Sequence, residues 1–378
     1  MFGSCLCAGP AATDLAESSD EREIEALLAG LQPSWTFTGG ATLAAGYKDN
    51  LLLGHSDPAA SPFVRAGVEA LLWRVPRGRI DYFGFVTAEY TRFTEEPRDR
   101  VGRKVGQEAE AFAGLEWRYR IPDRFSATFD VQGYHLDQVF DVSEVTGRRR
   151  IEALKVNGGK LASTVRWSPV RWAWVEISGS GDRQRFANGF NDADLTEGSA
   201  RLGGSPARWL DLSVAGSRRR REFDRRPRMA DFGDLPGLLQ IRESEAEARI
   251  DTHFGTRAKW RTRTVALRRE YRDNALGFLD FDQRGASQEV ELSTERWLLR
   301  LDGAYRHKKY PHQTVGLGID PPIAVREEVS GRLRVERKLS ARWTLLLEAG
   351  HERSRSNDEV ASYRANEGLL GARWNWEK

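Results

Sequence analysis

Hydrophobic and polar residues alternate with a period of two along most of the chain from Trp35 onward. In the first such segment one face carries Trp35, Phe37, Gly39, Ala41, Leu43, Ala45 and Tyr47, and the other carries Thr36, Thr38, Thr42 and Lys48. A period of two places successive side chains on opposite faces of a β-strand. Aromatic rings begin and end the apolar face, about twelve residues apart, which is typical of a strand that crosses a membrane.

The same alternation recurs in segments that begin near Ile80, Ala109, Trp297 and Trp343, and in each of them the second face carries charged residues. Charged side chains on the inner face of a small soluble sandwich would be costly, because burial removes their hydration. A wide lumen filled with water removes that cost. The pattern therefore predicts an all-β fold with apolar residues outside and polar residues inside.

The connections between these segments alternate in length. Short polar turns are predicted at 76–78, 122–124, 168–171, 205–208, 255–257, 294–296 and 340–342, and longer loops at 48–62, 94–103, 139–149, 187–193, 222–239, 273–283, 310–323 and 356–361. Seven turns and eight loops predict about sixteen strands. Short turns at one end and long loops at the other are typical of a transmembrane antiparallel up-and-down β-barrel, whose short turns face the periplasm. We expect this barrel to span 34–378.

The segment before the first strand has a different pattern. Residues 1–17 are similar to the end of a secretory signal, with small residues around Gly9 and Ala11, and we interpret them as a residual signal peptide or a disordered tail. A lipobox that ends at Cys5 is an alternative. Residues 18–33 predict a short periplasmic amphipathic helix, because Ser18 and Glu21 have capping-box spacing and the apolar residues that follow share one face.

Composition agrees with the barrel and excludes other classes. Mean hydropathy is −0.57 and charged residues make up 30% of the chain, so a membrane protein built from helices is excluded. The chain nevertheless holds 12 Trp, 17 Phe and 9 Tyr, as expected when lipid-facing and water-facing residues alternate. A net charge of +3 gives no reason to expect a nucleic-acid partner. Both cysteines, Cys5 and Cys7, lie at the N-terminus, and no motif for a metal or another cofactor is present in the body of the chain.

Two short motifs carry a resemblance to a known class. Gly371, Trp374 and Trp376 resemble the C-terminal assembly signal of outer-membrane barrels, although Glu377 and Lys378 follow the last aromatic residue. The segment GYKDNLLL at 46–53 resembles the end of the first strand in β-barrel porins. The resemblance implies a Gram-negative outer-membrane β-barrel protein that contacts membrane lipid, lipopolysaccharide and the barrel-assembly machinery. Assembly into a homo-oligomer is common for barrels of this size.

Charged residues on the inward-facing side of the predicted strands are the candidates for a pore lining. They are Arg166, Glu176, Arg201, Asp211, Glu247, Arg261, Arg263, Arg300, Asp302, Arg332, Arg334, Glu336, Glu348 and Arg373. Because both signs occur, cross-strand salt bridges in the wall are the alternative interpretation, and the two roles are compatible.

The densest charged segment is 217–234, which we place in the longest predicted loop. Its arginines are Arg218, Arg219, Arg220, Arg221, Arg225, Arg226 and Arg228. Folded into the mouth, they would attract anions by raising the local potential. The alternative is a solvated loop tip, or one that binds the phosphates of lipopolysaccharide.

The leading hypothesis for function is a porin-like passive channel for small hydrophilic solutes. Alternatives are an export or surface-assembly barrel with a periplasmic partner, and a structural envelope protein whose bore is closed by long loops. A soluble β-propeller would show a blade period instead of alternating short and long connections. We do not expect an enzyme, because the six histidines are scattered and none stands in a nucleophile motif. A metal site between His307 and His312 is a weak alternative.

Overall fold

The computed structural model describes residues 35–377, except for residues 54, 56–57, 75–78, 99–103, 123, 142–150, 231–232, 256–257 and 317–319. The predicted signal remnant at 1–17 and helix at 18–33 lie outside the described residues. The strands are β1 (Trp35–Lys48), β2 (Ser61–Arg74), β3 (Ile80–Phe93), β4 (Gln107–Ile121), β5 (Phe125–Asp141), β6 (Ile151–Val170), β7 (Ala173–Phe186), β8 (Ala193–Ala207), β9 (Leu210–Ala230), β10 (Gly233–Phe254), β11 (Lys259–Asp273), β12 (Phe281–Ser293), β13 (Trp297–Thr314), β14 (Ile323–Lys338), β15 (Trp343–Ser356) and β16 (Tyr363–Glu377). A short 3₁₀ helix, η1 (Glu359–Ala361), precedes β16.

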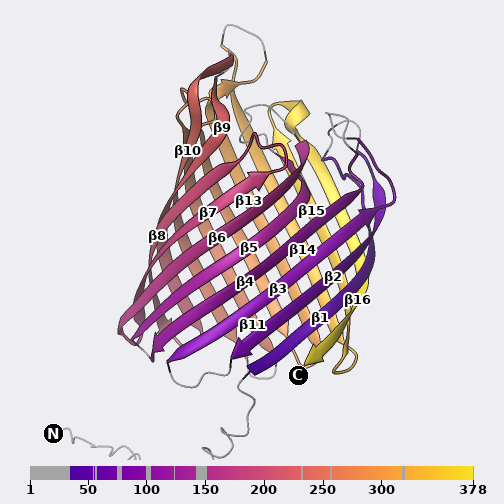
Figure 1. The fold of residues 1–378 in the computed structure, drawn as a ribbon, viewed down its shortest axis with the longest axis vertical. Coiled ribbons are helices and arrows are strands. Elements are labelled where there is room, and N and C mark those ends of the chain that lie inside the picture. The colour runs from indigo at the N-terminus through magenta and orange to yellow at the C-terminus, as the bar shows by residue number, and fades with distance from the viewer. Residues whose placement is uncertain are drawn as a thin grey trace, which may run out of the picture.

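Each strand pairs antiparallel with its neighbours in sequence, and β1 pairs with β16, so the sheet closes into a barrel (Figure 1). The prediction of an up-and-down barrel of about sixteen strands is confirmed. Closure satisfies the backbone groups of the first and last strands, which would otherwise be unpaired edges. The strands tilt across the barrel wall in Figure 1, with the C-terminus at the end that carries the short turns. We call this the turn end and the opposite end the loop end.

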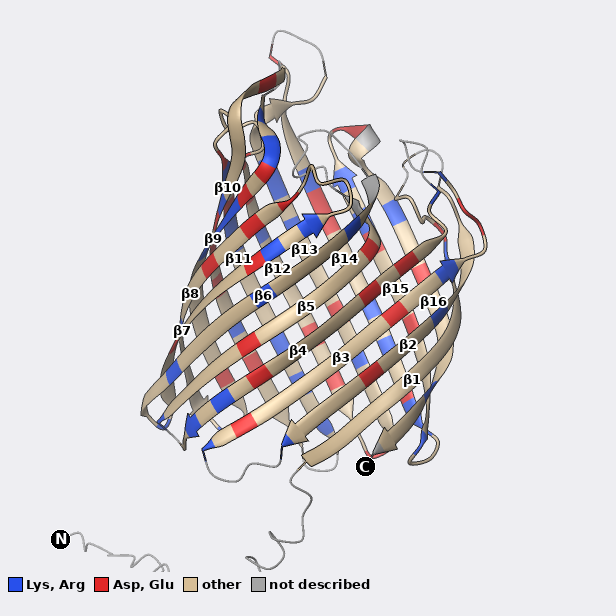
Figure 2. Ribbon diagram, in the orientation of Figure 1, with Lys and Arg blue, Asp and Glu red and all other residues tan. Residues whose placement is uncertain are grey.

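The outer face of the barrel is apolar over its middle height. Outward side chains such as Leu43, Val68 and Leu115 are exposed over 63%, 53% and 67% of their surface. Large exposed apolar surface is uncommon on proteins that stay in water and marks contact with another apolar phase. The alternation of the sequence therefore separates an apolar outer face from a charged inner one. Figure 2 shows acidic and basic residues distributed along the strands and not confined to the loops.

All twelve tryptophans of the chain lie at or near the turn end. They are Trp35, Trp73, Trp117, Trp167, Trp172, Trp174, Trp209, Trp260, Trp297, Trp343, Trp374 and Trp376. Several stand directly after a short turn, as Trp297 and Trp343 do. Toward the loop end, tyrosines such as Tyr47, Tyr90 and Tyr305 are the exposed aromatic residues on the outer face. Amphipathic rings at two heights are the usual boundary of a membrane-facing band.

The strand pair that closes the barrel contains the predicted assembly motif. Trp374 lies opposite Ala41 and Trp376 lies opposite Gly39, and the two indole rings are 5.0 Å apart. A Cβ atom on Gly39 would come within 2.6 Å of the Trp376 ring, so the glycine leaves the space in which the ring lies. Gly371 faces inward, where a Cβ would approach Ala44 to 2.6 Å. Small residues therefore let the two terminal strands meet.

The predicted long loop at 222–239 is wrong. β9 extends to Ala230 and β10 begins at Gly233, so the segment is a hairpin that stands above its neighbours at the loop end (Figure 1). The pairing of β9 with β10 continues past the barrel wall, with irregularities between Leu235 and Gln240. Above the apolar band charged residues stand on both faces of this hairpin, and its few apolar residues, such as Phe223 and Leu239, do not form a regular alternation that would indicate strands.

Candidate functional site

The fourteen predicted lining residues all lie on the inward face of their strands. Residues directly opposite each other in an antiparallel pair share a face. Arg166 faces Glu176, Glu176 faces Arg201, and the neighbours along these strands, such as Ile177 and Leu202, are the exposed apolar residues of the outer face. The same alternation places the remaining candidates inward: Asp211, Glu247, Arg261, Arg263, Arg300, Asp302, Arg332, Arg334, Glu336, Glu348 and Arg373.

Many of these charges form ion pairs that cross several strands. On one side of the wall, Arg373 Nη2 lies 2.6 Å from Glu336 Oε2, and Arg334 Nη2 lies 2.6 Å from Glu336 Oε1. Arg373 also reaches Glu69 on β2, at 3.3 Å, and Arg334 reaches Glu348 at 3.1 Å. The pairs therefore join β14 and β15 to β2 across the closing strands. Such a network holds wall side chains in fixed positions.

A second network crosses the opposite part of the wall. Arg219 Nη2 lies 2.8 Å from Glu197 Oε2, and Arg269 Nη2 lies 2.6 Å from Glu245 Oε2. Arg201 skips β9 and reaches Glu247 on β10, at 3.0 Å. Ala215, which has a short side chain, is the residue of β9 that stands between them. Arg201 and Glu247, both predicted as pore-lining residues, therefore form a salt bridge within the wall.

One cavity of about 540 Å³ is lined by residues from distant parts of the wall. From β3 and β4 it receives Glu89, Glu108 and Glu110, and from β13 and β14 it receives Arg300, Arg332 and Arg334. A second cavity, of about 590 Å³, shares Arg300 and Arg332 with the first and extends toward Arg263. Carboxylates are thus concentrated on the β3–β4 side of the lumen and arginines on the β13–β14 side, where Asp302 and Glu348 also line the cavity.

Each side contains like charges on adjacent strands. Glu89 stands directly opposite Glu110, and Arg300 stands directly opposite Arg334. Like charges in such positions destabilise a sheet. Arg65 lies 3.1 Å from Glu89, and Arg300 lies 3.3 Å from Glu289. These ion pairs offset part of the repulsion.

Two charged side chains in this cavity, Arg332 and Glu110, have no ion-pair partner within the described residues. The side chain of Arg332 forms no hydrogen bond or ion pair with any residue that the structure describes. Glu110 accepts a hydrogen bond of 3.0 Å from the amide of Gln138, and forms no ion pair within the described part of the chain. Neither charge is thus neutralised by an ion pair within the described residues. Their opposite signs produce a field across the lumen.

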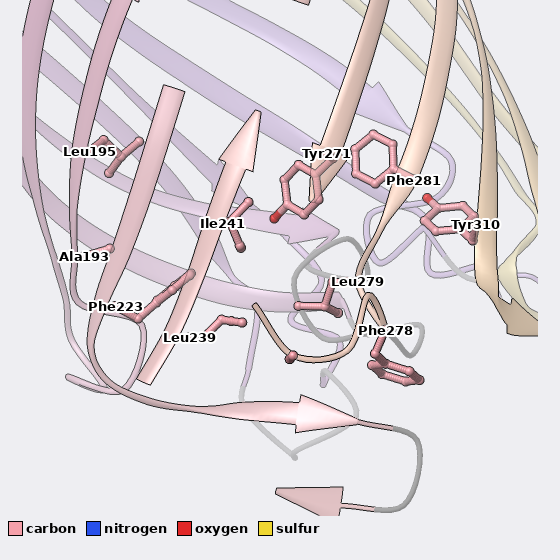
Figure 3. Close-up of a cluster of buried hydrophobic side chains, with 11 residues drawn as sticks. Ala193, Leu195, Phe223, Leu239, Ile241, Tyr271, Phe278, Leu279, Phe281 and Tyr310 are labelled. Carbon is pink, nitrogen blue, oxygen red and sulfur yellow. The ribbon is translucent and has the colours of Figure 1, made fainter. Parts of the chain in front are cut away.

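Apolar clusters narrow the loop end from inside. The larger consists of Ala193, Leu195, Phe223, Leu239, Ile241, Tyr271, Ala275, Phe278, Leu279, Phe281 and Tyr310 (Figure 3). It forms because the loop at 274–280 packs Phe278 and Leu279 against the ends of β8–β13. A smaller cluster places Leu51, from the loop after β1, against Phe63, Phe93 and Val105. These loops thus cover part of the inner wall near the mouth.

The loop at 274–280 is held by two carboxylates. Asp273 accepts hydrogen bonds from the backbone N–H groups of Ala275, Gly277 and Leu279. Asp280 accepts one of 2.7 Å from the N–H of Asp273. Burial raises the pKa of the Asp280 carboxyl above its usual range, and the nearby negative charge of Asp273 raises it too, against the opposing effect of that hydrogen bond.

The seven arginines of the basic segment do not form one group. Arg219 and Arg221 face inward, whereas Arg218 and Arg220 face outward. Arg226 is only 2% exposed and donates a hydrogen bond of 3.2 Å to Asn191. Arg225 lies above the wall near Gly189, and Arg228 donates to the carbonyl of Pro236 at 3.4 Å. The placement of these arginines in a single loop is therefore wrong, because they belong to β9, in which strand alternation sends neighbouring residues to opposite faces.

Several lumen charges are absent from the predicted set. They are Lys48, Arg65, Glu69, Glu89, Glu108 and Glu110. The alternation already places Glu89, Glu108 and Glu110 on the inner face of their strands. The signal that singles them out is the cross-strand register, which the sequence does not contain.

No helix among the described residues is both long and apolar enough to cross a membrane. Within the same residues, no group of three or more His, Cys, Asp and Glu side chains is arranged to hold a metal ion. His307 of the weak metal alternative faces outward, where its Nδ1 lies 3.7 Å from Glu327.

No protein-family model and no curated protein matches the sequence. Among solved structures, the loop L8 deletion mutant of OmpT, an outer membrane protein of Vibrio cholerae, is 14% identical, with 91% of this chain and 100% of that chain covered and a TM-score of 0.43. Acinetobacter baumannii OccAB4 is 7% identical, with 92% and 99% covered and a TM-score of 0.47. Pseudomonas aeruginosa OpdK, solved with vanillate, is 9% identical, with 90% and 99% covered and a TM-score of 0.44. This chain is thus similar to these proteins over nearly its whole length, at low sequence identity.

Proposed function

We propose that the protein is an outer-membrane channel of the porin type, which passively conducts small hydrophilic solutes. The observation that carries the proposal is the cavity at mid-lumen, in which Glu89 and Glu110 lie on one side and Arg300, Arg332 and Arg334 on the other. Charged side chains of both signs around a cavity suit solutes that are themselves hydrated and polar.

The outer face supports a location in a membrane. A closed barrel leaves no unpaired strand edge, and its outward Leu, Val and Trp side chains are exposed to an extent that suits lipid. The charges inside would then line an aqueous path, because a barrel of sixteen strands is wide enough to hold water.

The apolar clusters favour a second candidate, a structural barrel whose bore is closed at the loop end. The loop at 274–280 packs on the inner wall, and Leu51 packs there from the loop after β1. In this case the charged networks would serve only to hold the wall together.

Single-channel conductance in planar bilayers separates the two candidates. We expect the refolded full chain to give stable open steps, with an ion preference that is weak because both signs line the lumen. A protein that inserts into vesicles, as shown by protease protection, and stays silent in the bilayer would contradict the channel and favour the closed barrel.

A further inference from the structure

A second group of charges lies on the outside of the barrel, over β9–β12. It consists of six arginines: Arg218, Arg220, Arg242, Arg268, Arg272 and Arg284. Each lies two, four or another even number of positions along its strand from an exposed apolar residue, such as Val214 on β9 or Ile250 on β10. Residues at even spacing share one face of a strand, so these arginines point outward. We call this group the outer arginine patch.

The patch places arginines directly opposite one another. Arg242 of β10 faces Arg220 of β9 on one side and Arg272 of β11 on the other. Arg268 of β11 faces Arg284 of β12. Like charges in these positions repel each other and destabilise the sheet. Unlike the lumen, the outer face offers few carboxylates to offset this repulsion.

Within the described residues, four carboxylates contact arginines of the patch, and one of them, Asp280, lies 3.9 Å from Arg272. Glu222 pairs with Arg220, Glu270 lies 3.0 Å from Arg268, and Asp282 lies 2.5 Å from Arg272. The side chains of the other three arginines, Arg218, Arg242 and Arg284, form no hydrogen bond or ion pair within the described residues. Their guanidinium groups are free to bind an anion from outside the protein.

The height of the patch indicates which anion it meets. On β9 the exposed outer residues run from Trp209 at the turn end through Leu212 and Val214 to Arg218. Nine residues that each rise about 3.3 Å, in a strand tilted by about 40°, climb roughly 23 Å. This height matches the apolar band of an outer-membrane barrel, about 25 Å tall. The arginines therefore begin where lipid hydrocarbon ends and lipid phosphates begin.

We propose that the outer arginine patch binds the phosphate groups of lipopolysaccharide in the outer leaflet. The proposal rests on the outer-membrane location proposed above, since it needs that lipid beside the barrel. Guanidinium groups bind phosphate through two parallel hydrogen bonds, and the unpaired guanidinium groups of Arg218, Arg242 and Arg284 are the ones that can form them with a phosphorylated headgroup. A bound phosphate would remove the repulsion within each row.

The test compares two double variants that each remove two positive charges. Arg242→Gln/Arg284→Gln removes two unpaired arginines from the patch. Arg261→Gln/Arg332→Gln is the matched control, because both of its arginines are unpaired within the described residues but face the lumen. Purified full chain in detergent micelles is titrated with lipopolysaccharide, and binding is followed by native mass spectrometry.

We expect the patch variant to bind lipopolysaccharide about tenfold to thirtyfold more weakly, and the control to stay within about twofold of the wild type. Arg353 and Arg364, which face each other on the outer wall of β15 and β16, remain in both variants and account for residual binding. Equal weakening in the two variants would overturn the proposal. Full competition by millimolar inorganic phosphate would also overturn it, because the patch would then be a site for free phosphate.

Conductance measurements on the same variants test the channel function independently of lipopolysaccharide binding. The patch variant should conduct as the wild type does, since Arg242 and Arg284 lie outside the lumen. A wild-type barrel that gives no conductance in bilayers but binds lipopolysaccharide through the patch would contradict the proposed channel function and still support this inference.

Discussion

Arginines of the inner wall and arginines of the outer wall over β9–β12 have opposite surroundings. Inside, Arg334 and Arg373 both contact Glu336, which is only 7% exposed. Outside, Arg242 and Arg284 have no partner among the described residues. The same residue type thus holds the wall in one place and offers its charge to the surroundings in the other. In this barrel, whether an arginine stabilises the wall depends on whether a carboxylate lies within reach of its side chain.

The largest expected effect comes from breaking the inner network. Glu336→Gln removes the negative charge that Arg334 and Arg373 share, and their remaining partners, Glu348 and Glu69, are farther away. Because both arginines lose their shortest ion pair and Glu336 is only 7% exposed, we expect a loss of about 2–3 kcal/mol in the free energy of unfolding. Urea titration of the protein refolded in vesicles measures it.

The matched outer variant, Arg242→Gln, should change that free energy by about 0.5 kcal/mol or less, because it removes no contact. Equal effects of the inner and outer variants would remove the distinction between the two walls.

A smaller effect is expected where the barrel closes. Gly39→Ala places a Cβ within 2.6 Å of the Trp376 ring, so the indole must move from the β1–β16 seam. We expect a loss of about 1–2 kcal/mol and a lower temperature for the heat-induced mobility shift in gel electrophoresis. Gly331→Ala is the control, because the atom that its Cβ would approach, the carbonyl oxygen of Asp302, is 3.8 Å away. An equal fall in the transition temperature of the two variants would show that packing of the Trp376 ring against Gly39 does not stabilise the barrel.

The two sides of the lumen should respond to neutralisation in opposite directions. Glu110→Gln removes negative charge and should shift the reversal potential toward anion preference, whereas Arg332→Gln should shift it toward cation preference. Conductance should change by about twofold or less, because neither change alters the width of the lumen much. Salt-gradient recordings in planar bilayers measure both variants. Shifts of the same sign would mean that the two residues do not share one aqueous path.

The smallest effect concerns the loop at 274–280. The pKa of Asp280 is raised in the folded loop, so the folded state binds a proton more tightly than the unfolded chain does. Loop stability should therefore rise as the pH falls through the raised pKa of Asp280 and decline as the pH rises above it. Hydrogen-exchange protection factors for the amides of Ala275 and Gly277, corrected for intrinsic rates, report it. Asp280→Asn should abolish the pH dependence. An unchanged dependence in that variant would assign the effect to another group.

Much of the fold follows from local pattern, because a period of two in hydrophobicity reports on burial at each residue. The strand from Trp35 to Lys48 and the inward direction of Arg373 were predictable in this way. Register was not, because a shift of two residues keeps every side chain on its face. The opposition of Glu89 to Glu110, and of Arg242 to Arg272, therefore appears only in the structure.

The hairpin of β9 and β10 illustrates the other limit. Above the apolar band neither face of the sheet has to be apolar throughout, so a charged residue stands on the inner face at Arg219 and on the outer face at Arg220. A strand with two polar faces has the composition of a loop. Whether 18–33 forms a periplasmic helix stays a prediction, since it lies outside the described residues.

The gathering of all twelve tryptophans near one end gives the protein a built-in optical reporter. Intrinsic fluorescence will register events at the turn end, and the long loops at the other end contribute no indole emission from the described chain. Lipids brominated in only one leaflet should therefore quench the inserted protein strongly from one side and weakly from the other. Such an asymmetry would reveal, without any label, which way the barrel has entered a vesicle.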